Sequence, residues 1–386
     1  MVFHIINAMI MRLHTFTPSY KKSIISVMKT KVHTKTLKVR VRDKHISTLK
    51  KWAYGVNQVW NFCNETSMNA LKNHSELGAV KPVFLSGYDL QKYTKGMNKT
   101  FGLNSATVQM VGHEYVTRRK QFKKYRLNWR KTGGTRRSLG WIPVRKDCIS
   151  LKNGQVYHNR HYFSIWDSYG LSQYLFKSGS FNEDSRGRWY FNVVVEVEVE
   201  QGTGKASVGI DLGCKETATD SNGYKVKGRE YRKLEKSLGI AQRAKNKKRV
   251  KAIHAKIKNR RVDTLHKYSR KLVNENAAIF VGNVSSSGLV KTKMAKSVLD
   301  AGWSTLKTLL EYKSAHAGIV FAEINESYTT QTCSCCGSRC NSPKGRAGLR
   351  IREWTCECGV THDRDQNAAI NILALGHERL VVGIPH

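Results

Sequence analysis

The sequence has few acidic residues: 28 Asp and Glu stand against 67 Lys and Arg in 386 residues, a formal net charge of +39. Such an excess of one sign repels itself in a compact chain unless a polyanion neutralises it, so nucleic acid is the expected partner, bound with a steep salt dependence. No run of about 18 apolar residues is present, which excludes a membrane-spanning helix. A basic membrane-surface protein is the weaker alternative, because the charge is spread along the chain and is not one amphipathic helix.

Cysteine is unevenly distributed: six of the nine cysteines lie between 333 and 358. A secreted disulfide scaffold would be shorter and spaced more evenly, so the cluster favours a metal site in a reducing, cytoplasmic compartment. The start, MVFHIINAMIMRLHTF, lacks a basic n-region and a cleavage site, so we expect no targeting signal. A regular pattern begins only near Met28, and residues 1–28 are expected to be an extension that need not contain the native start.

The first half of the chain predicts a small sheet with a helical insertion. Residues 29–42 alternate between apolar and basic side chains, and short strands recur over 141–199, so both are expected to join one antiparallel sheet or barrel. Helical apolar spacing runs from Ile46 to about Ala70 and again from Ser105 to about Trp129. A 40% hydrophobic content is enough for a sizeable core, and the length predicts two or three domains.

Two basic segments are candidate nucleic-acid contacts. Between 118 and 131 there are eight basic residues, no acidic ones and three interleaved aromatics, which suits phosphate contacts combined with base stacking. The alternative is an amphipathic helix with a solvated basic face and aromatic core contacts. Between 225 and 270, mostly along one long helical pattern from Tyr231 to Arg270, there are 18 basic and three acidic residues. The candidates are Arg118, Arg119, Lys123, Lys124, Arg126 and Arg130 in the first segment, and Lys247, Lys248, Arg249, Arg260 and Arg261 in the second.

Strands alternate with helices from 206 onward, which predicts an α/β layer around a central sheet. Asp211 ends the first of these strands beside two glycines, in GIDLG, a setting that suits a hard cation such as Mg²⁺; a plain β-turn aspartate is the alternative. Asp363 and Asp365 open the last helix in DRDQNAA, where they serve either as an N-cap or as metal ligands.

The cysteine cluster predicts a closed, structural Zn²⁺ site. Cys333 and Cys336 form one CxxC knuckle, and Cys356 and Cys358 supply two more thiolates. The second half is CxC, a departure from the usual spacing, so Cys335 or Cys340 is an alternative ligand. A cluster of free thiols is the remaining reading, and it would be prone to oxidation.

Taken in order, GIDLG, TTQTCSCCG and DRDxNAA resemble the TnpB (OrfB) family, which are insertion-sequence-encoded, RNA-guided nucleases related to type V CRISPR effectors. The resemblance covers roughly 30–386 and implies an α+β multidomain fold. It implies a wedge-type β-barrel over 29–45 and 131–205 with a helical recognition lobe at 46–130. A RuvC-like nuclease domain of the RNase H fold would follow at 206–330 and 361–386, interrupted by a zinc ribbon at 331–360.

The resemblance also implies a catalytic centre. Asp211 matches the first RuvC carboxylate and Asp365 the last, and a third is needed between them to hold two Mg²⁺. Gly282 stands where the family has its middle glutamate, so either the nuclease is dead or the carboxylate comes from elsewhere. Glu326, at the end of the next strand, is the first candidate and Glu323 the second; a solvated turn residue is the alternative for Glu326.

Two classes of function follow. The first is an RNA-guided DNA endonuclease that binds a guide RNA from the transposon end and a double-stranded DNA target. A separate transposase of the same element would be a further partner, because no tyrosine with a histidine pair for strand joining is recognisable. The second is a guided DNA-binding repressor that does not cut, which Gly282 favours. A basic zinc-ribbon DNA-binding protein without a guide is the least specific reading.

Overall fold

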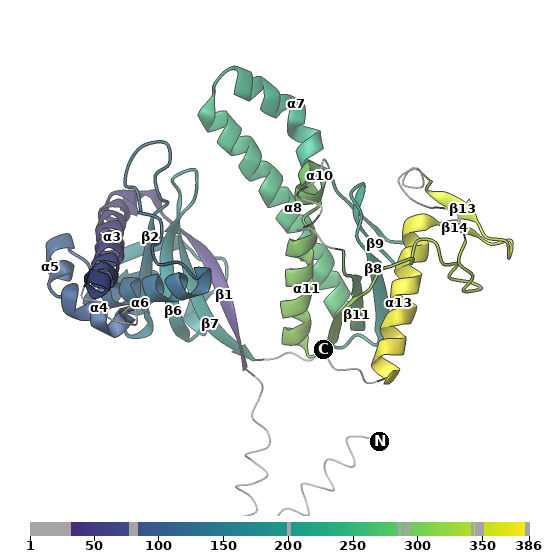
Figure 1. Ribbon diagram of the computed structural model, residues 1–386, viewed down its shortest axis with the longest axis horizontal. Coiled ribbons are helices and arrows are strands. Elements are labelled where there is room, and N and C mark those ends of the chain that lie inside the picture. Colours follow the sequence, from purple (N-terminus) through teal and green to yellow (C-terminus); the bar gives the residue numbers. More distant parts are fainter. Residues whose placement is uncertain are drawn as a thin grey trace, which may run out of the picture. The chain divides into compact units, whose positions relative to one another are not determined.

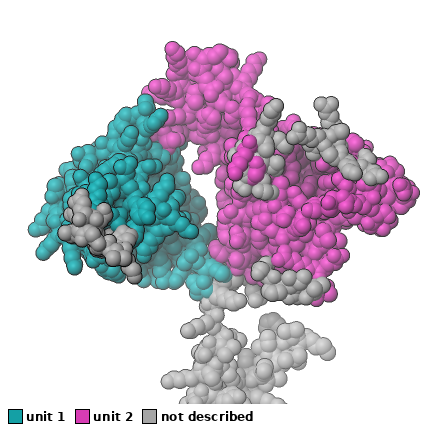
Figure 2. Space-filling model, in the orientation of Figure 1, with its two compact units in different colours: residues 1–184, 188–199 teal, residues 185–187, 200–386 magenta. Residues whose placement is uncertain are grey.

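The computed structural model describes residues 32–76, 84–198, 202–284, 295–340 and 351–382, with positions 288, 291 and 343 between them. The expected N-terminal extension at 1–28 lies outside the described residues. The chain divides into two compact units, residues 1–184 with 188–199, and residues 185–187 with 200–386 (Figure 2). None of the described helices is long and apolar enough to cross a membrane.

The first unit contains a seven-stranded antiparallel sheet in the order β2-β6-β7-β1-β5-β4-β3. Its two edge strands, β2 (Trp141–Arg145) and β3 (Ile149–Lys152), are joined only by the three-residue turn η3 (Lys146–Cys148). So short a link keeps the edges close, and the sheet therefore curls into a nearly closed barrel. The other strands are β1 (Val32–Val41), β4 (Gln155–His158), β5 (His161–Trp166), β6 (Phe176–Glu183) and β7 (Trp189–Glu198). The predicted joining of the first strand to the later ones is confirmed, since β1 pairs with β5 and β7.

Between β1 and β2 the described residues form the α-helices α3 (Ile46–Glu76), α4 (Gly87–Tyr93), α5 (Met97–Phe101) and α6 (Ser105–Phe122) (Figure 1). Helices α3 and α6 share one apolar core with the barrel. The short α4 begins at Ser86, which forms a reciprocal capping box with Asp89. That capping signal is readable in the sequence, although the weak apolar periodicity around it predicted no helix.

Helix α6 ends at Phe122, earlier than the predicted end near Trp129. Two asparagines of α3 hold the following segment out of the helix. The side chain of Asn64 bonds both backbone groups of Leu127, at 2.9 and 3.2 Å, and Asn61 bonds both backbone groups of Arg130, at 2.8 and 2.9 Å. These contacts join positions more than 60 residues apart, so the local periodicity of the segment does not reveal them.

The second unit contains a five-stranded sheet in the order β10-β9-β8-β11-β12. Strands β8 (Ala206–Asp211), β11 (Asn276–Gly282) and β12 (Val320–Ile324) are parallel, and β9 (Glu216–Asp220) is antiparallel to β8 and to β10 (Lys225–Lys227). The predicted central sheet with helices is present.

Helices cover both faces of this sheet (Figure 1). Ile279 and Val281 of β11 share a core with α8 (Lys247–Glu275), α10 (Ala295–Ala301) and α11 (Trp303–Ala317). Phe280, which alternates with them, packs with Ile372 of α13 (Arg364–Val382) on the opposite face. Helix α13 lies so close to β8 that a Cβ at Gly209 would stand 2.1 Å from the carbonyl oxygen of Ala369, so only glycine fits there.

The predicted long helix from 231 to 270 is instead a hairpin of α7 (Glu230–Arg243) and α8. Lys245 adopts a left-handed φ of 51°, and Asn246 caps α8 by accepting a hydrogen bond from the amide of Arg249 at 2.9 Å. A small apolar cluster holds the two helices together, formed by Leu238, Ala241, Ile253 and Ile257. The sequence did not reveal Asn246 as a helix cap, because the basic residues on both sides of it are equally compatible with one continuous solvated helix.

Candidate functional site

Three carboxylates come together at one end of the sheet in the second unit. Asp211 ends β8 and, by the alternation of the strand, points to the same face as Gly209, toward α13. Asp365 lies in the first turn of α13, and Glu326 follows β12. Burial, together with the negative charges of Asp365 and Glu326, raises the pKa of Asp211 to about 8. Asp365 and Glu326 are therefore each close enough to Asp211 to repel its charge in the absence of a cation.

Glu326 occupies the space that a side chain at position 282 would take. A Cβ built on Gly282 would lie 2.3 Å from Oε2 of Glu326 and 3.3 Å from Cδ1 of Ile372. This Oε2 is buried and has no hydrogen-bond partner among the described residues. Burial raises the pKa of Glu326. Glycine at 282 and glutamate at 326 thus fit each other, and the alternative of a solvated turn residue does not describe Glu326.

Glu323, the second candidate, points elsewhere. It alternates along β12 with Ile324, which packs on the α13 side, so its side chain lies on the other face of the sheet. There it is exposed and forms an ion pair of 2.6 Å with Lys307 of α11. The structure therefore brings Glu326, and not Glu323, to Asp211.

The two aspartates of DRDQNAA have different surroundings. Asp363 accepts a hydrogen bond from the amide of Gln366 at 3.0 Å and pairs with Lys225, so the N-cap interpretation applies to it. Asp365 lies near Asp211 and raises its pKa. Its carboxylate accepts two hydrogen bonds from Arg352, at 3.0 and 3.3 Å. No motif in the sequence singles out Arg352, which precedes the second cysteine pair.

The donor set suits Mg²⁺, which prefers carboxylate oxygens and few protein ligands per ion. Glu326 has a buried carboxylate oxygen without a hydrogen-bond partner, and the pKa of Asp211 is raised by burial and by its negative neighbours; a bound cation would relieve both. Among the described residues, the group of side chains whose ligand atoms come close enough together to hold a metal ion is the cysteine cluster.

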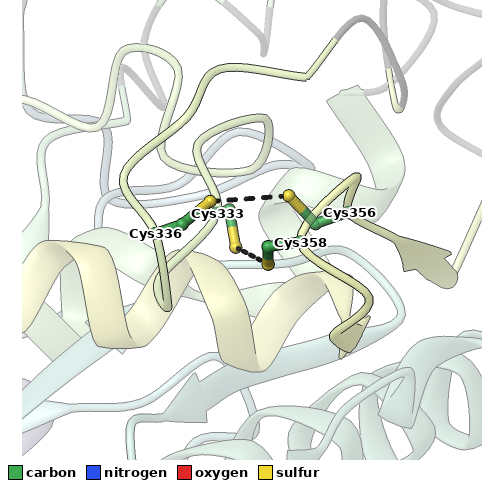
Figure 3. Close-up of side chains that lie close together, drawn as sticks. All are labelled: Cys333, Cys336, Cys356 and Cys358. Carbon is green, nitrogen blue, oxygen red and sulfur yellow. Dashed lines mark hydrogen bonds between the residues drawn. The ribbon is translucent and has the colours of Figure 1, made fainter.

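The cysteine cluster forms between β12 and α13, beside the hairpin of β13 (Glu353–Thr355) and β14 (Thr361–Asp363). Figure 3 shows the side chains of Cys333, Cys336, Cys356 and Cys358 turned toward one another. All four sulfurs lie within 4.8 Å of one another. Each pair is followed by a glycine with positive φ, 74° at Gly337 and 86° at Gly359, which lets the chain turn tightly around the sulfurs. This set is compatible with zinc, and the CxC spacing does not prevent it from closing.

The two alternative thiols differ. Cys335 is exposed and lies outside the set of four. Cys340 is also outside the set, but its Sγ is 3.5 Å from that of Cys356. Hydrogen bonds from Ser338 lower the pKa of Cys336 to about 6, which favours the thiolate form that binds metal.

A buried asparagine joins the cysteine cluster to the carboxylates. The side chain of Asn367 accepts from the amide of Ser334 at 2.9 Å and donates to the carbonyls of Thr329 and Thr332 at 3.1 and 2.8 Å. Asn371 donates to the same two carbonyls. Thr329 in turn bonds the carbonyl of Glu326 through its amide and its hydroxyl. The turn that carries Glu326 is thereby fastened to the helix that carries Asp365, a role that the sequence analysis did not assign.

The first basic segment is divided between surface and interior. Arg118, Lys123, Lys124 and Arg126 are exposed, and so are Phe122, Tyr125 and Trp129, which contradicts the alternative of aromatic core contacts. Arg119 departs from the expected basic surface: it is 3% exposed and donates to the carbonyl of Leu85, because it lies one turn after the buried Tyr115. Arg130 also turns inward and donates to Asn57 and to the carbonyl of Leu139.

The second basic segment is mostly solvent-facing. Lys247, Lys248 and Arg249 are exposed in the first turn of α8, and Arg260 is exposed with Glu230 at 3.9 Å. Arg261 differs, since it donates to the carbonyl of Leu299 at 2.8 Å and lies 3.9 Å from Asp300. It therefore anchors α8 to α10.

Comparison with known proteins agrees with the motifs. Residues 190–293 match the OrfB_IS605 family model, described as "Probable transposase", and residues 303–372 match the model "Cas12f1-like, TNB domain". This chain is similar to the TnpB and Cas12f proteins. The resemblance drawn from GIDLG, the cysteines and DRDxNAA is thus confirmed.

Two relatives and one solved structure illustrate the similarity. A Streptomyces pristinaespiralis protein named "Putative RNA-guided DNA endonuclease" is 35% identical over 50% of this chain and 52% of its own length. "Putative RNA-guided DNA endonuclease InsQ" of Escherichia coli (strain K12) is 29% identical over 52% of this chain and 56% of its own. The chain thus spans about half the length of these curated relatives. The Cas12f1 chain in a complex with single guide RNA and target DNA superposes with a TM-score of 0.54 at 12% identity, covering 88% of this chain and 98% of that one, which shows a shared fold.

Proposed function

We propose that this protein is an RNA-guided DNA endonuclease whose middle catalytic glutamate is Glu326. The observation that carries the proposal is the buried Oε2 of Glu326 in the space above Gly282, beside Asp211 and Asp365. The relatives that are named RNA-guided DNA endonucleases support the reaction class. The fold shared with a Cas12f1 chain supports a RuvC-like domain at 206–330 and 361–386, a ribbon at 331–360, a barrel at 29–45 and 131–205, and a recognition lobe at 46–130.

Asp211, Glu326 and Asp365 would hold two Mg²⁺ ions through their carboxylate oxygens. When bound, the ions supply Lewis-acid stabilisation at the scissile phosphate and activate the attacking water. The chain's own part is to present three ionised carboxylates at fixed positions. Asp211 must lose its proton to do so, and a cation bound beside it would favour the ionised form against the burial and the negative neighbours that raise its pKa. Four thiolates leave no open coordination position, so the zinc that we assign to the cysteine cluster is structural.

The partners proposed are a guide RNA from the transposon end and a double-stranded DNA target. Base pairing would select the sequence, while the exposed lysines and arginines neutralise phosphates without reading it. Strand joining would belong to a separate transposase. A cytoplasmic setting, in which thiols stay reduced, suits the cysteine cluster.

A guided repressor that does not cut is the second candidate. Gly282 favours it, because the usual glutamate is missing. The position of Glu326 opposes it, because its buried Oε2 has no hydrogen-bond partner among the described residues, which costs stability unless a cation binds there.

Cleavage by the protein purified with RNA from its own locus tests the proposal. A matched duplex and Mg²⁺ are offered to wild type, Asp211→Ala, Glu326→Ala and the control Glu323→Ala. We expect wild type and Glu323→Ala to cut, and the other two variants to bind the target with unchanged affinity but to lose at least about 10³-fold in rate, since each removes a ligand of the transition-state cations. Tight binding by wild type without cleavage would establish the repressor instead.

A further inference from the structure

Two aromatic and basic hollows lie side by side at the carboxyl end of α6 in the first unit. The first, of about 320 Å³, is lined by Phe84, Arg119, Lys120, Lys123, Lys124 and Tyr125. The second, of about 480 Å³, is bordered by Phe122 and Trp129 and shares Lys124 with the first. No acidic residue lines either hollow among the described residues. Both belong to the first unit, whereas the three carboxylates belong to the second.

The aromatic rings of Phe84 and Tyr125 are exposed to solvent and are not part of the apolar core of the unit. Phe84 is 47% and Tyr125 is 67% exposed, and their rings stack with centroids 5.8 Å apart and planes 17° from parallel. Leaving two flat apolar surfaces in water costs free energy that burial would recover. Arg119 lies over one face of Phe84, so the face of the pair that is open to another flat ring is the outer face of Tyr125.

Arg119 fixes this platform from the interior. Its guanidinium lies 5.2 Å from the centre of the Phe84 ring, and its Nη2 donates to the backbone carbonyl of Leu85 at 2.7 Å. A buried cation therefore holds both the ring and the backbone beside it. This explains why Arg119, expected on the surface, is placed inside: it positions Phe84.

The end of α6 brings the lysines and Tyr125 to the platform. Lys123 takes a left-handed φ of 51°, which is unfavourable for a residue with a side chain, and the amide of Lys124 bonds back to the carbonyl of Arg119 at 3.2 Å. Lys120, Lys123 and Lys124 are exposed, and within the described part of the chain none of them forms a salt bridge. Three unpaired cations beside two flat rings match a phosphate chain with a free base.

We propose that these hollows bind two consecutive unpaired nucleotides of a single strand, one base against Phe84 and Tyr125, the next against Phe122 and Trp129, with the intervening phosphate on Lys124. A base inside a duplex has both faces covered by its neighbours, so an unpaired base is the ligand that fits. The proposal rests on the proposed function only in taking nucleic acid as the partner. The single strand is either RNA, as an unpaired part of the guide, or DNA, as a displaced strand.

Binding of short labelled probes to the full chain tests this without Mg²⁺ or cleavage. The probes are a single-stranded RNA of about 12 nucleotides, a DNA of the same sequence, its duplex, and a poly-glutamate peptide of similar charge. Tyr125→Ala is compared with Tyr125→Phe, and Tyr93→Ala is the matched control, because Tyr93 lies in the same unit and is 55% exposed. The triple variant Lys120→Gln, Lys123→Gln, Lys124→Gln tests the cations.

We expect Tyr125→Ala to weaken single-strand binding by about 5- to 150-fold, while Tyr125→Phe and Tyr93→Ala bind as wild type and the duplex is unaffected. The salt dependence should stay the same for Tyr125→Ala. For the triple lysine variant the slope of log K against log salt should fall by up to about 2, which is about 0.7 per phosphate contact. The strand that loses affinity, RNA or DNA, identifies the source of the ligand.

Three outcomes would overturn the proposal: an equal effect of Tyr125→Ala and Tyr93→Ala on single strands, an equal loss for duplex and single strand, or equal competition by the acidic peptide. Each is independent of cleavage. A wild type that binds single strands through Tyr125 but never cuts would refute the proposed nuclease and leave the hollows standing. If wild type cuts the matched duplex but Tyr125→Ala binds single strands as tightly as wild type, the proposed nuclease stands and the proposal for the hollows is refuted.

Discussion

The cysteine cluster and the carboxylate group are two sites of opposite construction in one unit. The cluster draws its four ligands from two short segments, each turned by its own glycine, and its sulfurs already lie within 4.8 Å of one another. The carboxylates come from three elements that span more than 150 residues of sequence, and the charges of two of them, Asp365 and Glu326, repel that of Asp211. Local spacing builds the first site, whereas the second depends on a whole sheet and one helix being in place. The second site should therefore be the more easily broken.

The largest effect should come from filling the space above Gly282. In Gly282→Glu two carboxylates compete for one position, because a Cβ there already meets Oε2 of Glu326 at 2.3 Å. We expect cleavage to fall by at least about 10³-fold and to return in part in Gly282→Glu with Glu326→Ala, which restores a single carboxylate. The rate of cleavage of a matched duplex under single-turnover conditions measures both.

Gly239→Ala is the matched control for that experiment, because a Cβ at 239 meets only Arg243, at an ordinary 3.5 Å. It should cut as wild type. If Gly282→Glu alone were fully active, Glu326 would not be the middle carboxylate. If the double variant had no activity while remaining folded and able to bind DNA, the exchange of positions inferred from the structure would be wrong.

The cysteine site should be lost as a unit. Cys356→Ala removes one of four ligands, so we expect zinc content to fall from about one ion per chain to well below half, and protease cleavage near 333–358 to increase. Cleavage of DNA should fall by about 10²-fold, less than for Gly282→Glu, because the carboxylates are displaced and not removed. Cys335→Ser, outside the set of four, should keep its zinc. Full zinc retention in Cys356→Ala would show that Cys340 takes its place.

The sequence predicted the features that depend on short stretches of chain, but not those that depend on hydrogen bonds between distant residues. The four thiolates, both basic segments, the sheet of the second unit and the pairing of the first strand with later ones all follow from spacing and alternation over short stretches. The ends of α6 and α7 do not, because Asn61, Asn64 and Asn246 decide them through hydrogen bonds to particular backbone groups. Glu326 and Glu323 were both candidates from the sequence. The physical reason to choose Glu326 comes from the fold, because only the structure shows on which face of the sheet each side chain lies.

Asn367 connects the two sites, so its loss should weaken their coupling without removing either. Asn367→Ala deletes the hydrogen bonds that tie the turn of Glu326 and the first cysteine knuckle to α13. We expect the Mg²⁺ concentration for half-maximal cleavage to rise by about tenfold, with zinc content and affinity for the DNA target unchanged. Asn371→Ala, which shares two of these acceptors, should have a smaller effect. Loss of activity with an unchanged Mg²⁺ midpoint would mean that Asn367 supports only the fold.

The smallest effect should be on stability and should depend on pH. The pKa of Asp211 is about 8 in the folded protein against 3.8 as its ordinary value, so between these values the folded state binds more protons than the unfolded state. The free energy of unfolding contributed by this group therefore falls as pH rises from about 4 to about 8, and Glu326, whose pKa is also raised, acts in the same direction. We expect Asp211→Asn to raise the melting temperature in Mg²⁺-free buffer by about 2–4 °C at pH 8 and by less at pH 5. Mg²⁺ should stabilise the wild type and not the variant, because the carboxylates that repel one another would then share a cation. If wild type and Asp211→Asn had equal melting temperatures at both pH values, with and without Mg²⁺, Asp211 would not be repelled by its neighbouring carboxylates. The contrast between a cysteine site built by local spacing and a carboxylate site held against charge repulsion would then not hold.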